Sequence, residues 1–155
     1  MTTLDPAVIE RLRQSGIRID KEGEFQHEGA PVRHEGLRQA LFRWLDRLPD
    51  GRVILRLDER RFAYVDVDDT PLVVRGARVA GDRVLLTLSD GTEEPLVPET
   101  LTIDGHGVMR CAVRDGKLEA RLSTAAASVL AEVIDDTTAP TLLLGGRRHL
   151  LGPRG

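Results

Sequence analysis

Two segments of the chain carry apolar residues at the spacing of an amphipathic helix. The first segment has them at i, i+3, i+4, i+7, i+8 and i+11, namely Leu37, Ala40, Leu41, Trp44, Leu45 and Leu48. The second, which Ser123 opens as a capping residue, repeats the pattern with Leu122, Ala126, Val129, Leu130, Val133 and Ile134. Both segments are predicted to be helices. A short N-terminal helix is also expected, with Asp5-Pro6 as its start and Gly16 as its end.

Alternating apolar and polar residues predict strands through the rest of the chain. The expected strands are 17–20, 24–27, 52–57, 62–67, 72–80, 83–88, 93–97, 101–103, 108–113, 118–122, 141–144 and 147–151. The central three are separated by Gly81-Asp82 and Asp90-Gly91, and such pairs supply the positive φ angles that tight hairpins need. This middle stretch is therefore predicted to be an antiparallel meander.

The predicted elements occur in the same order twice. Residues 17–67 and 108–151 both run strand, turn, strand, amphipathic helix, strand, turn, strand, although their letters hardly match. The expected fold is α+β: two similar strand-turn-strand-helix-hairpin units flanking the β meander, with the short N-terminal helix in front. The expected division is 1–70 for the N-terminal helix and first unit, and 71–155 for the meander and second unit. Packing of both as one compact domain is the alternative.

Composition excludes several classes of function. The 155 residues carry a net charge of -3 and one cysteine, so internal disulfides and thiolate zinc clusters are excluded. Phosphate-backbone binding needs a basic excess that is absent, and no apolar run is long enough to span a bilayer. We therefore expect a cytoplasmic protein with no nucleic-acid or membrane partner. Cys111 lies in an alternating strand and is expected to point into the core.

Several collinear motifs resemble a bacterial family, domain of unknown function 1285. The first is Gly-Glu-Phe-Gln-His-Glu-Gly-Ala-Pro-Val-Arg at 23–33, followed by Leu37 and Leu41-Phe42. Further matches are Asp50-Gly51, Val-Asp-Asp-Thr-Pro-Leu at 67–72 and Leu-Glu-Ala-Arg-Leu at 118–122. The resemblance implies a fold with repeated structural motifs and a role in signal transduction. The chain departs from the family in having Phe25 for a common tryptophan, Leu72 for phenylalanine, and no tyrosines in its last helix.

The segment around 29–36 gathers the candidate ligand-binding residues. His-Glu-Gly occurs at 27–29 and again at 34–36, and two imidazoles with two carboxylates are candidate ligands for a divalent ion. A metalloprotease helix would need its two histidines four residues apart, and these are seven apart, so no metal site is assigned. Arg33 is the strongest single candidate, because its guanidinium can bind an anionic ligand, unless Glu35 or Asp68 neutralises it.

The predicted site is therefore a ligand-binding one, formed by His27, Arg33, His34 and Asp68, with no catalytic residue and no cofactor assigned. No nucleophile elbow, phosphate loop or dinucleotide motif is present. The sequence favours a small ligand-sensing or protein-interaction module, whose ligand or protein partner it does not name. Two alternatives stay open: a metal-dependent enzyme that uses the His27 and His34 region, and a structural homodimer subunit.

Overall fold

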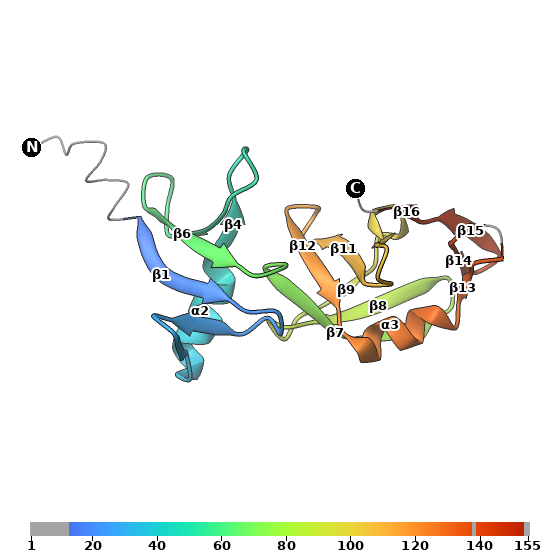
Figure 1. The fold of residues 1–155 in the computed structure, drawn as a ribbon, viewed down its shortest axis with the longest axis horizontal. Coiled ribbons are helices and arrows are strands. Elements are labelled where there is room, and N and C mark those ends of the chain that lie inside the picture. Colours follow the sequence, from blue (N-terminus) through green and yellow to red (C-terminus); the bar gives the residue numbers. More distant parts are fainter. Residues whose placement is uncertain (1–12, 138, 154–155) are drawn as a thin grey trace, which may run out of the picture. The chain divides into compact units, whose positions relative to one another are not determined.

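Strands joined by short turns form most of the described chain (Figure 1). The computed structural model describes residues 13–137 and 139–153. The chain divides into two compact units, Met1–Pro71 and Leu72–Gly155, and each has its own strand pairing and its own buried residues. None of the helices in these described ranges combines the length and apolar character that crossing a bilayer demands.

The first unit consists of one mixed sheet and one helix. Its elements are β1 (Gln14–Ile19), β2 (Phe25–His27), β3 (Ala30–Pro31), α2 (Glu35–Trp44), β4 (Leu45–Arg47), β5 (Val53–Arg56) and β6 (Phe62–Val67). The strand order is β3-β2-β1-β6-β5-β4, with β1 and β6 parallel and the other neighbours antiparallel. Helix α2 packs on this sheet through Phe42, whose ring meets the ring of Phe25 edge to face at 4.7 Å between centroids.

Gly16 lies inside β1 and does not end a helix there, contrary to the sequence prediction. Its φ of 71° falls in the left-handed region, and the pairing of β1 with β6 shifts register between Gln14 and Arg18. The predicted N-terminal helix itself falls on residues 1–12, which lie outside the described residues. The bulge at Gly16 re-establishes the pairing that places buried Ile19 opposite Val67.

The second unit consists of a seven-stranded sheet, a three-stranded sheet and one α-helix. Its elements are β7 (Leu72–Ala80), β8 (Arg83–Leu88), β9 (Glu93–Pro95), the short 3₁₀ helix η1 (Pro98–Thr100), β10 (Thr102–Ile103), β11 (Met109–Val113), β12 (Leu118–Leu122), α3 (Thr124–Ala131), β13 (Ile134–Asp135), β14 (Thr141–Leu144), β15 (Arg147–Leu150) and β16 (Gly152–Pro153). The larger sheet has the order β16-β10-β11-β12-β7-β8-β9, and the smaller one β13-β14-β15. Ser123 caps α3 by accepting from the Ala126 amide at 3.2 Å.

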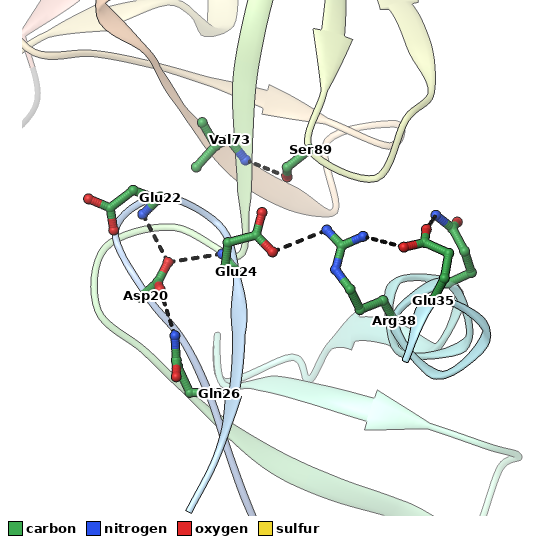
Figure 2. A network of polar contacts seen from close by, with 9 residues as sticks. Asp20, Glu22, Glu24, Gln26, Glu35, Arg38, Val73 and Ser89 are labelled. Carbon is green, nitrogen blue, oxygen red and sulfur yellow. Dashed lines mark hydrogen bonds and ion pairs between the residues drawn. The ribbon is translucent and has the colours of Figure 1, made fainter. Parts of the chain in front are cut away.

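The meander of β7, β8 and β9 lies where the sequence predicted it. Strands β7 and β8 have the expected bounds, and β9 is two residues shorter than expected. The buried Ser89 hydroxyl accepts from the Val73 amide at 3.0 Å (Figure 2). The Ser89 amide also donates to the Val73 carbonyl, at 2.8 Å. These two bonds join the end of β8 to the start of β7.

The predicted α+β class is wrong, because the chain is mostly β. The described residues form sixteen strands and two α-helices, and each helix ends before its predicted end. Residues 45–47 leave the helix and pair with β5, and residues 134–135 do the same with β14. In both cases an apolar residue that extends the helical spacing, Leu45 or Ile134, lies in a strand, since pairing with a neighbouring strand overrides weak local propensity.

The predicted repeat does not produce two equivalent units. In the first segment, the strands on both sides of α2 join one sheet, in which β6 lies beside β1. In the second segment, β11 and β12 belong to the seven-stranded sheet, whereas β14 and β15 form a separate sheet with β13. The order of elements recurs, but the strand pairing differs.

Two hairpin turns of the second unit touch each other. Gly145 lies in the turn between β14 and β15, and Asp82 lies in the turn between β7 and β8. A Cβ atom on Gly145 would lie 2.5 Å from Cβ and 3.1 Å from Cα of Asp82, so no side chain fits there. Glycine at 145 therefore allows the two turns to approach.

Candidate functional site

A two-residue turn after the first candidate histidine leads the chain through β3 to helix α2. His27 at the end of β2 pairs with Ala30 at the start of β3, and between them Glu28 and Gly29 both have positive φ, 50° and 86°. Positive φ at both central residues is what a type I′ hairpin turn requires. Strand β3 is an edge strand, where Pro31 is tolerated because no further strand needs its missing N–H.

Three of the four predicted site residues line one groove in the first unit. His27, Arg33 and His34 all contribute to it, and the groove has a volume of about 370 Å³. The other walls are apolar and come from β1, the β3 edge and the first two turns of α2, with Ile17, Val32 and Leu37 among them. We call this site the α2 groove. An apolar surface with a few polar groups is the usual composition of a small-ligand site.

His34 caps the helix that forms one wall of the α2 groove. Its Nδ1 accepts a hydrogen bond from the Leu37 amide at 3.0 Å, which satisfies one of the free N–H groups at the start of α2. A nitrogen that accepts from an amide carries no proton, so the neutral ring has its proton on Nε2. A Cβ on Gly36 would lie 3.0 Å from His34 Cε1, so the absence of a side chain at 36 lets the ring fold over the helix end.

Two acidic residues in or beside α2, Glu24 and Glu35, are bound by side chains of the helix (Figure 2). Arg38 of α2 donates to Glu35 at 3.0 Å and to Glu24 at 3.1 Å, and Gln39 donates to Glu35 at 2.9 Å. The hydrogen bonds from Gln39 and then Arg38 hold the pKa of Glu35 below its usual value. Glu35 is therefore a fixed carboxylate at the start of α2, oriented by Arg38 and Gln39.

Asp68 does not belong to the α2 groove. It follows β6, where its amide donates to the Ile19 carbonyl at 2.9 Å and its carboxylate lies 3.6 Å from the Arg18 guanidinium. The structure thus separates it from His27, Arg33 and His34. Across the described ranges, neither Glu35 nor Asp68 forms an ion pair with Arg33, whose side chain is exposed.

The α2 groove offers no set of metal ligands. Within the described part of the chain, no group of three His, Cys, Asp or Glu side chains is placed to hold a metal ion. His34 is unsuited on its own account, because a metal on Nε2 would move the ring proton to Nδ1 and abolish its bond from Leu37. The metal-dependent alternative therefore has no ligand set among these residues.

Two further segments with potentially reactive side chains form a turn and part of the core. Asp104 accepts from the amides of His106 and Val108 at 2.8 and 3.0 Å, so Gly-His-Gly at 105–107 is a turn closed on a carboxylate. Cys111 is buried, and burial raises the pKa of its thiol to about 12. Neither supplies a reactive group.

Sequence reasoning missed the apolar wall of the groove and the part played by Arg38. Leu37 belongs to the apolar spacing of the helix, yet it is 45% exposed at the groove. Arg38 lies outside that apolar spacing, but it joins the β1–β2 hairpin to α2. The signal in the sequence is a short helix whose apolar residues begin in its first turn, ahead of the residues that cover the sheet.

Two solved structures are similar to this chain in fold. One is a DUF1285 family protein from Silicibacter pomeroyi DSS-3, with a TM-score of 0.74 and 20% identity over 89% of this chain and 80% of that one. The other is a DUF1285 family protein from Shewanella baltica OS155, with a TM-score of 0.62 and 16% identity over 75% of this chain and 90% of that one.

The chain therefore has a DUF1285-like fold, which confirms the resemblance seen in its motifs. At these identities the likeness concerns the fold alone. No family model matches the sequence, and the search of curated proteins gave no match.

Proposed function

We propose that the protein is a binding module that senses a small ligand in the α2 groove. The carrying observation is the placement of His27, Arg33 and His34 around one cavity with apolar walls. Ligand pockets typically have a volume of about 300–1,000 Å³ and combine an apolar lining with a few polar groups, which is the composition found here. A role in signal transduction is part of the proposal and rests on the family resemblance.

Filling the groove tests the proposal. Ala30 is exposed and lines the groove, so Ala30→Trp should block it while leaving the hairpin paired. Ala125→Trp is the control, because Ala125 is an exposed residue of α3 in the other unit. The measurement is a thermal-shift screen with nucleotides, cyclic dinucleotides, organic acids and divalent ions.

A compound that raises the melting temperature of the parent and of Ala30→Trp equally binds elsewhere and counts against the groove. The proposal expects a shift that Ala30→Trp abolishes and Ala125→Trp retains. The binding role is wrong if two results occur together. No compound in the panel raises the melting temperature of the parent, and in a pull-down no protein binds the parent but fails to bind Ala30→Trp.

A further inference from the structure

We infer that the α2 groove selects a small organic acid: one carboxylate held by Arg33 and His34, with an aliphatic or aromatic body on the apolar wall. The inference rests on the proposed binding role of the groove and names the chemical class of its ligand. The choice of a carboxylic acid follows from the charge and number of the polar groups in the groove and from the apolar character of its other walls.

The positive side of the groove comes from Arg33. Its planar guanidinium can donate two parallel hydrogen bonds to a carboxylate. The two acidic residues that the sequence suggested as its partners are taken: Glu35 by Arg38 and Gln39, and Asp68 by Arg18. Among the described residues, neither of these carboxylates pairs with the Arg33 guanidinium, so we infer that it is available to a ligand's charge.

His34 adds a donor and no acceptor. Because Nδ1 accepts from the Leu37 amide, the neutral ring carries its proton on Nε2, the nitrogen left over for a ligand. A donor suits an anion and opposes a metal ion or an ammonium group. His34 therefore favours an anionic ligand, as Arg33 does, and both residues line the same groove.

The count of donors favours a carboxylate over a phosphate. A helix start binds phosphate through several free amides, but here the Leu37 amide is already used by the His34 ring. One guanidinium and one imidazole N–H can satisfy the single negative charge that a carboxylate shares between its two oxygens.

The apolar wall selects what is attached to the carboxylate. Ile17, Val32 and Leu37 line the groove with aliphatic surface, and Leu37 is 45% exposed without a ligand. Burying one methylene is worth about 0.8 kcal/mol, which is roughly a fourfold gain in affinity. Affinity should rise along a series of straight-chain acids until the groove is filled.

Isothermal titration with named probes tests the inference. The probes are butyrate, hexanoate and benzoate, with hexanamide as the neutral analogue and inorganic phosphate and zinc chloride as the competing classes. We expect hexanoate to bind more tightly than butyrate, by roughly fourfold for each added methylene. We also expect no binding of hexanamide, phosphate or zinc at the same concentrations.

Three variants assign the binding to the named groups. Arg33→Gln should weaken hexanoate by roughly tenfold to a hundredfold, the range for a charge-assisted hydrogen bond. Arg60→Gln, in the exposed loop between β5 and β6, removes the same charge away from the groove and should change nothing. Gly36→Ala should weaken hexanoate, because its Cβ crowds the His34 ring, and should change the melting temperature little, because the helix preference of alanine offsets a weakened cap.

The outcomes separate this inference from the proposed function. If phosphate, zinc or a nucleotide binds and Ala30→Trp abolishes that binding, the groove is a ligand site but the carboxylate assignment is overturned. Equal binding of hexanoate and hexanamide, or equal binding to the parent and Arg33→Gln, also overturns it. Failure of every probe and of the wider screen overturns both.

Discussion

His34 has two functions at one ring, since one nitrogen caps α2 and the other belongs to the groove. His34→Ala should lower the free energy of unfolding by about 1 kcal/mol, the usual loss when a capping side chain is removed. His34→Asn should restore most of that stability, because asparagine is among the best capping residues, but it should not restore binding of hexanoate. Urea denaturation and titration calorimetry of both variants measure the two effects separately.

If both variants unfold like the parent, the hydrogen bond to the Leu37 amide contributes nothing. If the parent and His34→Asn bind hexanoate equally tightly, Nε2 of His34 does not contact the ligand.

The thiol of Cys111 should be inert in the folded protein. It is buried between the paired strands, and its pKa of about 12 leaves almost no thiolate at neutral pH. We expect a thiol reagent such as iodoacetamide to modify it only after denaturant unfolds the chain, as followed by mass spectrometry. Rapid modification of the native protein at pH 7.5 would show that β11 opens readily.

At the residue scale, the sequence predicted what is local and missed what depends on pairing between distant strands. His27, Arg33 and His34 are close along the chain, so one tight turn is enough to bring them to the same groove. The sequence prediction included Asp68 only because its carboxylate can pair with an arginine. Its actual partner, Arg18, is set by the parallel pairing of β1 with β6, which links residues some fifty positions apart.

At the scale of elements, the bulge in β1 should depend on glycine. Gly16→Ala should destabilise the protein by about 1–2 kcal/mol, because alanine is strained at a φ of 71° and its Cβ would lie 3.3 Å from Cγ of Glu28. Gly105→Ala is the matched control, since no atom lies within 4 Å of its added Cβ. Chemical denaturation of both variants measures the difference. Equal midpoints would contradict the prediction that the bulge needs glycine at position 16.

The helices show why element boundaries were the weakest part of the sequence prediction. Leu45 continues the helical spacing from Leu41, yet it starts β4 and pairs with Leu55. Asp46, next to it, is held by Arg56 of β5 at 2.8 Å. A buried leucine fits either element, so only the partner strand decides, and the local pattern does not contain that partner.

For the whole molecule, two carboxylates whose pKa is lowered in the folded chain should make stability fall in acid. Hydrogen bonds from Arg61 and Arg110 lower the pKa of Asp58 and Asp104, one in each unit, to about 2 from 3.8. These groups bind protons more weakly when folded, so their stabilisation is complete above pH 4 and is lost as the pH falls toward 2. We expect the melting temperature to fall over that interval, as followed by circular dichroism.

Two variants identify the groups responsible. Asp104→Asn keeps an oxygen acceptor but removes the titrating charge, so its melting temperature should be lower at pH 5 and should depend less on pH between 4 and 2. Glu59→Gln, at an exposed position in the loop before β6, should follow the parent. A parent-like slope for Asp104→Asn would show that other groups govern acid unfolding.

The fold of the whole molecule was harder to predict than its motifs. Collinear short motifs led to a family whose solved members share the fold, and the meander was placed by its glycine turns. The order of elements in 17–67 and 108–151 nevertheless suggested a repeat that the sheets do not form. Which strands become neighbours depends on long-range pairing, and nothing in the order of elements specifies it.

The contact between Gly145 and Asp82 determines where the chain can accept an inserted peptide tag. A tag placed in either of these turns would push the β14–β15 hairpin away from the meander, because the backbones already touch. The loop at 58–61 has four exposed residues and joins two strands that pair directly, so it can be lengthened outward. Fluorophores or affinity sequences for partner searches should therefore be introduced at 58–61.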